Sequence, residues 1–502
     1  MSKRILIASR GDIAVRIARV LLEKGYQPLG VYTEHDKESP HRRLVVEEAR
    51  VSSYTDPKEI VEVALKLGAD AVHPGYGSSS RSLELQLEVA RKGLVFIAPP
   101  ASIVEFTRDK PAVKMLAEKI GVPTLPWTMI SDETDLREFA RVYGYPLIVK
   151  PAKGSWGRGL RILWSENDVD DLKTVVKNAG RLFGDTRVYV EPFIASAKHI
   201  EVQLIGDGER VIHLFERECS LQDDYLKILA EAPSKAVTGE LRSKLVNYAT
   251  ILGDALRLKD VVTVEFLYDT RNSNIYLLEV NPGLTPEHLA TEIATGVNII
   301  EKQVEVALYS ALKLKQENVE LKEWVLEAVV FNKKLSGDGA SAGLIEYYEE
   351  PGGPGISVDP GIAPGVKVSS EYTLLAKIAA WGSDRATAMN RLRRAISEIS
   401  VGGVETNIPL LKEVLSLKEV EDGAYTIRLL DEKKNTISSN IRSKMLLHSI
   451  AAVALVEYGD KAAREVFTRN QKHPESLAAE ASRIKRSAWF YYIRLRERMR
   501  RH

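Results

Sequence analysis

Two acidic residues lie in apolar segments that are predicted to form neighbouring strands. Glu265 lies in the run 262–267 and Glu279 lies in the run 275–281, with a short polar turn between the two runs. The two carboxylates are therefore expected side by side, and like charges in an apolar sheet are costly unless a cation lies between them. Asn281 adds an amide oxygen on the face of Glu279, which gives the oxygen set that Mg²⁺ prefers. A pair of exposed strand residues is the alternative.

A glycine-rich turn over 153–159 lies between predicted strands near 147–150 and 160–164. Glycines allow backbone N–H groups to converge on anionic oxygens, and Lys150 and Arg158 add positive charge beside them. The pattern is typical of a loop that folds over phosphates. An ordinary hairpin is the alternative, because glycine-rich turns are common.

The first hundred residues supply a different scaffold, in which strands alternate with helices. A strand over 4–8, a helix over 11–22 and a strand over 29–32 form a βαβ unit, and apolar runs at 71–73 and 95–97 continue the pattern. We expect a doubly wound parallel sheet. The first turn lacks the spaced glycines of a dinucleotide fingerprint, which disfavours an NAD-type site.

The composition describes a globular protein with no dominant charge. The 502 residues include 70 Lys plus Arg and 69 Asp plus Glu, a net charge of +1, which disfavours a protein whose whole body binds nucleic acid. The single cysteine, Cys219, excludes an internal disulfide framework or a Cys-rich zinc site, and we expect it in the core. No apolar run is long enough for a transmembrane segment or a signal peptide, so a cytoplasmic location is expected.

Across residues 1–430 the sequence resembles the biotin carboxylases of the ATP-grasp superfamily. The matching phrases occur at 8–17, 73–77, 109–110, 150 with the turn after it, 199–203, 216–222, 231–233, 279–281 and 287–288. So many matches in one order argue against a chance resemblance.

The resemblance implies an enzyme that binds ATP between a lid and a body. It implies that the nucleotide contacts, besides the metal-binding carboxylates, come from Lys110, Lys150, Gly157, Gly159, Glu191, His199 and Gln222. It implies Mg²⁺ or Mn²⁺ on Glu265, Glu279 and Asn281. Lys227 falls at the family's bicarbonate-site lysine and Glu287 at its general base. In the family, ATP phosphorylates bicarbonate to carboxyphosphate, which then delivers CO₂ to biotin on a carrier.

Two family arginines are absent from the sequence. Gly283 stands where the family carries the arginine that clamps bicarbonate, and Ser357 stands where a second arginine stabilises the charge on carboxyphosphate and biotin. Thr285 also replaces a glutamine of the same site. Loss of an arginine fork from a buried anion site costs several kcal/mol. Either another arginine, such as Arg158 or Arg81, does the missing work, or the chain has lost carboxylation.

Further departures fall on the nucleotide side. Lys153, Ser155 and Trp156 interrupt the all-glycine turn of the family. An Asp-Asp-Tyr run at 223–225 replaces the family's Arg-Arg-His, and Phe-Asn-Lys-Lys-Leu at 331–335 replaces its Ile-Asn-Ala-Glu-Asp.

The chain is expected to fold as an α/β protein with a helical extension. The predicted parts are an N-terminal α/β domain (1–125), an ATP-grasp lid (126–205), an ATP-grasp body (206–325), a β-rich C-terminal domain (326–435) and a basic helical extension (436–502). We expect a biotin carboxylase component of an acyl-CoA carboxylase that uses biotin on another chain. The alternatives are a non-catalytic subunit of such an assembly and an ATP-grasp ligase for another carboxylic acid.

The extension is predicted to form helices over 444–458, 461–467 and 474–501. The last of these is basic and aromatic, a composition that suits docking on an acidic partner protein, packing on its own body, or contact with membrane or nucleic acid. We favour docking on another protein of the complex. The partners that we expect are a biotin carboxyl carrier protein and a carboxyltransferase subunit, within a homodimer or larger assembly.

Overall fold

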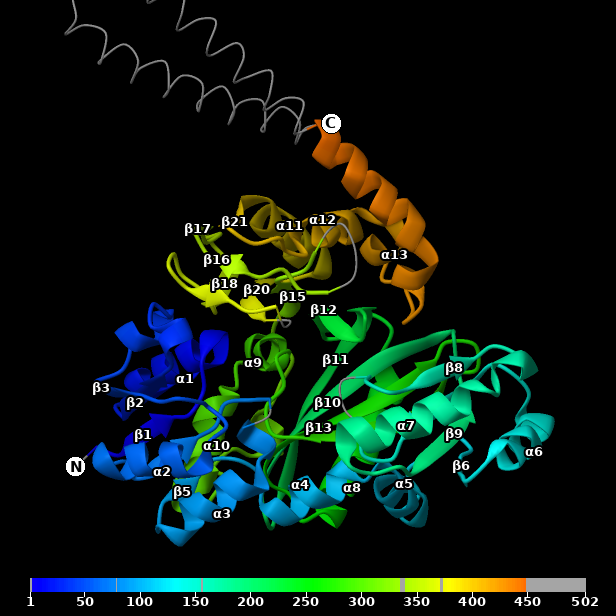
Figure 1. The fold of residues 1–502 in the computed structure, drawn as a ribbon, viewed down its shortest axis with the longest axis horizontal. Coiled ribbons are helices and arrows are strands. Elements are labelled where there is room, and N and C mark those ends of the chain that lie inside the picture. Colours follow the sequence, from blue (N-terminus) through cyan, green and yellow to red (C-terminus); the bar gives the residue numbers. More distant parts are fainter. Residues whose placement is uncertain (1, 78, 155–156, 335–338, 371–372, 448–502) are drawn as a thin grey trace, which may run out of the picture. The chain divides into compact units, whose positions relative to one another are not determined.

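A computed structural model describes residues 2–447 except 78, 155–156, 335–338 and 371–372 (Figure 1). The chain divides into two compact units, residues 1–432 and 433–502. In the second unit, residues 433–447 are helical. The helices predicted over 461–467 and 474–501 lie outside the described residues, as does most of the one predicted over 444–458. No helix within the described part combines the length and apolar composition needed to cross a membrane.

The first sheet is parallel, with the strand order β3-β2-β1-β4-β5. Its strands are β1 (Arg4–Ile7), β2 (Gln27–Tyr32), β3 (Glu47–Arg50), β4 (Ala71–His73) and β5 (Val95–Phe96), and its helices are α1 (Gly11–Glu23), α2 (Pro57–Lys66) and α3 (Leu83–Arg91). Side chains of β1 alternate between two cores: Ile5 packs in the cluster of α1, and Leu6 packs in the cluster of α2. Helices therefore cover both faces, which confirms the predicted doubly wound sheet.

A second sheet is antiparallel, with the order β6-β9-β7-β8. Its elements are β6 (Thr128–Ile130), α6 (Glu133–Tyr143), β7 (Leu147–Pro151), β8 (Arg161–Leu163), η4 (Glu166–Asp168), α7 (Asp171–Phe183) and β9 (Val188–Pro192). Leu136 of α6 and Leu172 of α7 are buried with apolar residues of the strands. The predicted strands on either side of the glycine-rich turn are confirmed.

The largest sheet has eight antiparallel strands in the order β14-β13-β10-β11-β12-β15-β20-β18 (Figure 1). They are β10 (Ala197–Asp207), β11 (Val211–Asp223), β12 (Leu226–Ala232), β13 (Lys259–Asp269), β14 (Asn274–Pro282), β15 (Trp324–Phe331), β18 (Ile356–Pro360) and β20 (Leu374–Gly382). Because β12 pairs with β15, the sheet continues through the boundary predicted between residues 325 and 326. The body and the β-rich C-terminal region thus share one sheet.

Helices and short strands complete the first unit. The helices are α4 (Ala101–Arg108), α5 (Lys110–Lys119), α8 (Gly239–Ala255), α9 (His288–Thr295), α10 (Ile299–Tyr309), α11 (Arg385–Glu398), α12 (Ile408–Ser416) and α13 (Lys418–Glu421). The short strands are β16 (Gly343–Leu344), β17 (Tyr347–Glu349), β19 (Lys367–Val368) and β21 (Ser400–Gly402). The 3₁₀ turns are η1 (Glu34–Asp36), η2 (Pro40–Arg43), η3 (Ser79–Arg81) and η5 (Gln316–Asn318).

Strand β13 shows how the large sheet separates its core from its polar face. Val262, Val264 and Phe266 are buried in the apolar cluster that includes side chains of α8. Because side chains alternate along a strand, Thr263 and Glu265 point to the opposite face. The sequence of β13 therefore fixes which face carries charge.

Asp260, near the start of β13, is a buried carboxylate away from that polar face. One of its oxygens accepts hydrogen bonds from the Val261 N–H at 2.7 Å and the Gln303 amide at 2.7 Å. Its other oxygen has no hydrogen-bond partner among the described residues. Burial raises the pKa of Asp260 from 3.8 to about 7, although both donors oppose the shift.

The contribution of Asp260 to the free energy of unfolding should therefore decrease as the pH rises. Between about pH 4 and pH 7 the folded protein holds a proton on Asp260 that the unfolded chain has released, so the free energy of unfolding decreases through that window. The Asp260→Asn variant cannot ionise and keeps an acceptor oxygen. We expect its thermal midpoint, relative to the wild type, to rise between pH 4.5 and pH 8 in thermal denaturation experiments. A difference that stays constant with pH would contradict this assignment.

Candidate functional site

Three glutamates lie in register on adjacent strands of the eight-stranded sheet. Glu279 of β14 is opposite Glu265 of β13, and Glu265 is opposite Glu201 of β10. We call these three residues the carboxylate row. The pairing confirms that Glu265 and Glu279 lie side by side, and Glu265 is buried, which excludes the alternative of two exposed strand residues.

Cations converge on the carboxylate row from two other elements. Lys227 of β12 contacts Glu201, and its Nζ lies 2.8 Å from Glu265 Oε1. Lys110 at the start of α5 places its Nζ 3.0 Å from Glu279 Oε2. Each carboxylate of the row therefore has a lysine in contact with it.

Two side chains on the row's own strands add further contacts. His199 Nε2 lies 3.0 Å from Glu265 Oε2, and Asn281 Nδ2 donates to Glu265 Oε1 at 2.7 Å and to Glu279 Oε1 at 3.0 Å. The structure therefore brings these predicted site residues together.

The surroundings of the row favour the charged forms of Glu279 and His199. Burial alone would raise the pKa of Glu279, but Lys110 and the Asn281 amide hold it at about 2. Burial alone would lower the pKa of His199, but the neighbouring carboxylates of Glu265 and Glu201 raise it to about 9. At neutral pH Glu279 is thus ionised and the His199 imidazole is protonated.

Arg217 is a fully buried partner of the row that the sequence analysis did not place in the site. It lies opposite Glu201 in the register of β10 and β11, and its Nε donates to Glu201 Oε2 at 2.7 Å. Its NH1 and NH2 groups donate to Gln203, Thr291, Thr263 and Thr285. With these donors engaged, Arg217 supports the row from within the protein. The signal for Glu201 was present in the sequence, since it lies two residues after His199 on the same strand face.

A second cluster joins the four-stranded sheet to α5. Glu191 of β9 forms ion pairs with Lys150 of β7 and with Lys114 of α5, whose Nζ lies 2.7 Å from Glu191 Oε2. Burial would raise the pKa of Glu191, but the two lysines lower it to about 2. Lys150 and Glu191 were predicted to contact the nucleotide, whereas Lys114 was not identified because a lysine within an amphipathic helix normally faces solvent.

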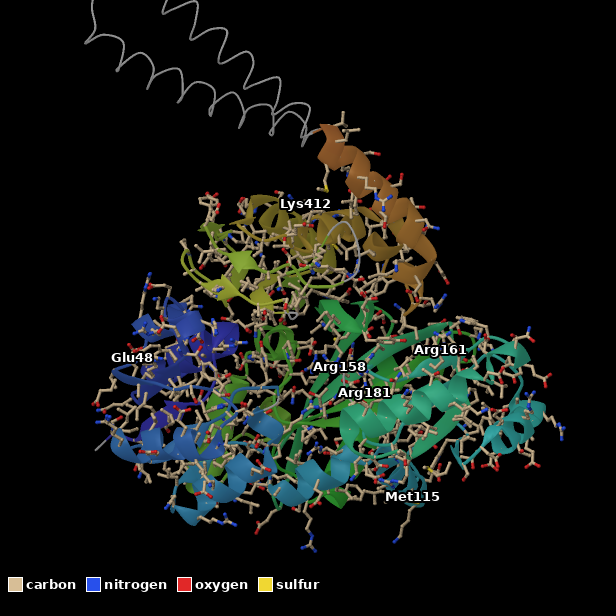
Figure 2. The ribbon with its side chains drawn as sticks, in the orientation of Figure 1. Glu48, Met115, Arg158, Arg161, Arg181 and Lys412 are labelled. Atoms are coloured by element: carbon tan, nitrogen blue, oxygen red, sulfur yellow. The ribbon has the colours of Figure 1, made fainter. Side chains whose placement is uncertain are left out.

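The glycine-rich turn lies between β7 and β8. Gly157 and Gly159 have φ angles of +64° and +77°, which glycine adopts without strain. A Cβ at Gly157 would meet the Tyr225 ring at 2.4 Å, so the turn packs closely on Tyr225. Lys110 also donates to the carbonyl oxygen of Gly154, which links the turn to the carboxylate row. Arg158, labelled in Figure 2, is exposed on this turn.

Gln222 and Glu287 approach the row from two further elements. Gln222 Nε2 lies 2.9 Å from His199 Nδ1 and donates to the Cys219 carbonyl oxygen at 2.9 Å. Glu287, the residue before α9, is buried, and its Oε2 has no hydrogen-bond partner in the described part of the chain. The electrostatic field of Glu287 acts on Lys227. Cys219 is buried in an apolar cluster, as predicted.

The donor set of the row fits a hard divalent cation. Glu265 and Glu279 offer carboxylate oxygens, and the lysines and the Asn281 Nδ2 already bring positive charge to them. Asn281 Oδ1 accepts a hydrogen bond from Arg81. His199, Glu201 and Glu265 also bring ligand atoms within 4.8 Å of one another. Mg²⁺ prefers carboxylate and amide oxygens to an imidazole nitrogen, so the oxygen set is the better Mg²⁺ site.

The structure shows the neighbours of several residues that depart from the family pattern. Asp223 forms an ion pair with Lys333, whose Nζ also lies 3.4 Å from Asp224 Oδ2. Asp223 and Asp224 thus stand where the resembled family carries two arginines, and both lie near Lys333, which belongs to the run that replaces the family's Ile-Asn-Ala-Glu-Asp. Ser357 lies on β18 opposite Ala379. Ser155 and Trp156, which interrupt the turn, lie outside the described residues.

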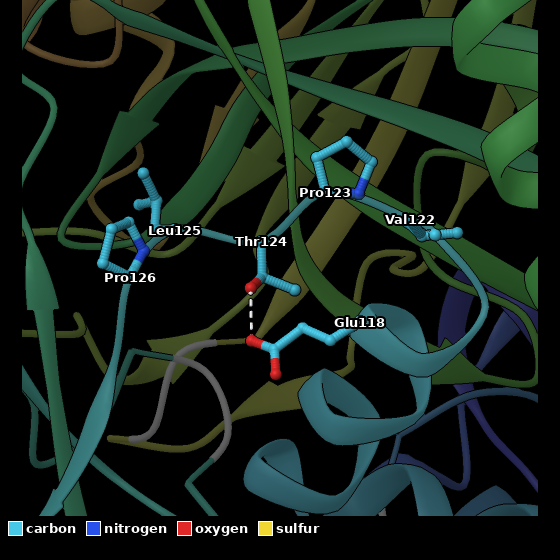
Figure 3. A pocket seen from close by; sticks show the side chains of 7 residues that line it. Glu118, Val122, Pro123, Thr124, Leu125 and Pro126 are labelled. Atoms are coloured by element: carbon cyan, nitrogen blue, oxygen red, sulfur yellow. Dashed lines mark hydrogen bonds between the residues drawn. The ribbon is translucent and has the colours of Figure 1, made fainter.

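One surface pocket, of about 410 Å³, lies apart from these clusters on the connector between α5 and β6 (Figure 3). Its one charged lining residue, Glu118, accepts hydrogen bonds from Thr124 Oγ1 at 2.8 Å and from Trp127 Nε1 at 2.7 Å. The Glu118 carboxylate therefore holds the connector in place.

Family models match three consecutive parts of the chain. Residues 1–104 match the biotin carboxylase N-terminal domain, residues 109–315 match the ATP-binding domain of the carbamoyl-phosphate synthase L chain, and residues 336–432 match the biotin carboxylase C-terminal domain. Together these matches include the carboxylate row and the lysines around Glu191.

Relatives extend the match over most of the chain. Biotin carboxylase 1 of Bacillus subtilis is 33% identical over 443 residues, which cover 86% of this chain and 98% of that protein. Biotin carboxylase of Pseudomonas aeruginosa is 32% identical over 445 residues, which cover 86% and 99%. The biotin carboxylase domain dimer of Hydrogenobacter thermophilus 2-oxoglutarate carboxylase, solved with MgADP, ADP and bicarbonate, has a TM-score of 0.83 at 32% identity and covers 87% of this chain and 99% of its own. The chain therefore belongs to the biotin carboxylase family.

Proposed function

We propose that the chain is the biotin carboxylase component of a multi-subunit carboxylase and uses MgATP and bicarbonate to carboxylate biotin on a separate carrier protein. The observation that carries the proposal is the carboxylate row, with Lys110, Lys227 and Asn281 converging on it. Lysines and a divalent ion together neutralise the charge that develops on transferring phosphoryl oxygens. No described contact favours the alternatives of a non-catalytic subunit or a ligase for another acid.

The nucleotide would be bound by residues of both clusters. Glu265, Glu279 and Asn281 would hold Mg²⁺ or Mn²⁺, which, when bound, supplies positive charge to the phosphate oxygens. The proposed nucleotide contacts, beside those carboxylates, are Lys110, Lys150, Gly157, Gly159, Glu191, His199 and Gln222. Lys110 contacts both the turn and the row, so it is positioned to orient the phosphates between them.

Lys227 and Glu287 are the proposed catalytic pair for bicarbonate. Glu287 is buried with an oxygen that lacks a partner among the described residues, so it can accept the proton of the bicarbonate hydroxyl. Lys227, whose ammonium contacts Glu201 and Glu265, is the proposed bicarbonate-site lysine, and the charge of Glu287 acts on it. The charge of Lys227 is secure, because the neighbouring carboxylates raise its pKa despite burial.

The partners proposed are a biotin carboxyl carrier protein and a carboxyltransferase subunit. One relative is named as the small subunit of 2-oxoglutarate carboxylase, and the solved biotin carboxylase domain of that enzyme is a dimer. Docking through the basic extension at 436–502 stays a prediction, since residues 448–502 lie outside the described part. A cytoplasmic location is likewise a proposal.

Phosphate release from MgATP tests the proposed reaction. We expect release by the purified chain to increase when bicarbonate is added and again when free biotin is added. Bicarbonate accepts the phosphoryl group of ATP, and biotin takes up the CO₂ as carboxyphosphate releases phosphate. Glu279→Gln serves as the blank, since it removes a proposed metal ligand with little change of shape. A rate that neither addition changes, with nucleotide binding intact, would contradict the proposed function.

A second prediction separates the proposed base from nucleotide binding. Glu287→Gln keeps the shape of the buried side chain but cannot accept a proton, so we expect bicarbonate-stimulated release to fall about 10²–10⁴-fold. Binding of MgADP, measured by calorimetry, should stay within about twofold of the wild type because Glu287 makes no proposed nucleotide contact. If the Glu287→Gln variant released phosphate at the wild-type rate, another group would have to accept the proton.

A further inference from the structure

Arg81, at the end of η3, is a partly buried arginine beside the carboxylate row. Its NH2 group donates to Asn281 Oδ1 at 3.0 Å, and Asn281 is its one hydrogen-bond partner among the described residues. No carboxylate of the described residues forms an ion pair with it. Most of its five N–H donors therefore have no acceptor within the described part of the chain.

An unpaired guanidinium in this setting is costly. Removing a cation from water without a matching anion destabilises the folded protein, and other arginines of this unit that are withdrawn from water are paired: Arg217 with Glu201 and Arg385 with Glu231. A bound anion would remove the cost.

The turn that carries Arg81 packs beside Gly283, where the family's bicarbonate arginine is missing. A Cβ built on Gly283 would lie 3.9 Å from Ser80 Oγ and 3.8 Å from Pro99 Cδ. Gly283 also has a φ angle of +86°, which favours glycine over a residue with a side chain. A side chain at position 283 would therefore contact the 79–81 turn, so Arg81 lies on the segment that packs against this position.

We infer that Arg81 is the residue that binds bicarbonate through its guanidinium, in place of the arginine absent at position 283. The inference rests on the proposed function and names a residue of its anion site. A planar guanidinium fork matches the two oxygens of a small carboxylate-like anion. The same anion would lie within reach of groups that serve the reaction, because Arg81 and the row share Asn281.

Other cations are less suited to this role. Arg158 is exposed on the glycine-rich turn. Lys377 is fully buried between Asp12 and Asp359, with Nζ–Oδ2 distances of 3.4 Å and 3.6 Å, so its charge is already balanced. Arg217 has its donors engaged, as described above.

The test compares bicarbonate affinity in Arg81 variants. For the wild type, Arg81→Lys and Arg81→Gln, we would measure KM for bicarbonate and for ATP in phosphate release, and bicarbonate binding by calorimetry with MgADP present. Arg81→Gln keeps a donor for Asn281 but loses the charge, so we expect KM and Kd for bicarbonate to rise about 10- to 100-fold, with KM for ATP within about twofold. Arg81→Lys keeps the charge but loses the fork, so its rise should be smaller. Arg91→Gln, on the exposed end of α3, is the matched control and should change neither value.

The outcomes separate this inference from the proposed function. Wild-type affinity for bicarbonate in Arg81→Gln would overturn the role of Arg81 while leaving the reaction in place. Another outcome is that the wild type binds bicarbonate but shows no bicarbonate-dependent release, while Arg81→Gln no longer binds it in calorimetry. This outcome would support the role of Arg81 in binding bicarbonate and contradict the proposed reaction. A wild type that does not bind bicarbonate would overturn both. If Arg81→Gln does not fold, Arg81→Lys decides the question through the same KM ratio.

Discussion

The repulsion among Glu201, Glu265 and Glu279 is the constraint on which the surrounding structure depends. Two like charges about 4 Å apart repel by about 4 kcal/mol at an effective dielectric constant near 20. The protein offsets this cost with groups from separate elements: Lys110 from α5, Lys227 from β12 and Arg217 from β11. The sheet, the helix after the parallel domain and the glycine-rich turn are thereby tied to one electrostatic site, and a divalent cation fits the same need.

The residues that depart from the family pattern can be explained by their neighbours in the structure. Asp223 stands at a family arginine and pairs with Lys333, which stands at the family's alanine, so the acid introduced by one change has a cationic partner introduced by the other. Gly283 and Arg81 lie on neighbouring segments in the same way, one having lost an arginine and the other carrying one. These exchanges argue that the site has been rearranged with its charge balance kept, which is what an active enzyme requires.

Local patterns predicted much of the fold and the centre of the site, whereas residues placed by long-range packing could not be predicted in this way. The alternation in 262–267 and the apolar run over 275–281 were enough to place Glu265 beside Glu279, because a short turn between two strands fixes their pairing. Glu201 and Arg217 face each other only through the register of β10 and β11. The contact of Arg81 with Asn281 joins residues 200 positions apart in sequence, so the sequence offered Arg81 only as one of two candidates.

The most direct test of the carboxylate row is the binding of Mn²⁺, used as a paramagnetic probe for Mg²⁺, in the presence of ADP. Electron paramagnetic resonance titration of the wild type should show an ADP-dependent site. Glu279→Gln should weaken this site at least about tenfold, because one of the three proposed oxygen ligands loses its charge. Glu240→Gln, whose carboxylate is 80% exposed on α8, should bind as the wild type does. Equal Mn²⁺ affinity in the wild type and Glu279→Gln would contradict the assignment of the row as the metal site.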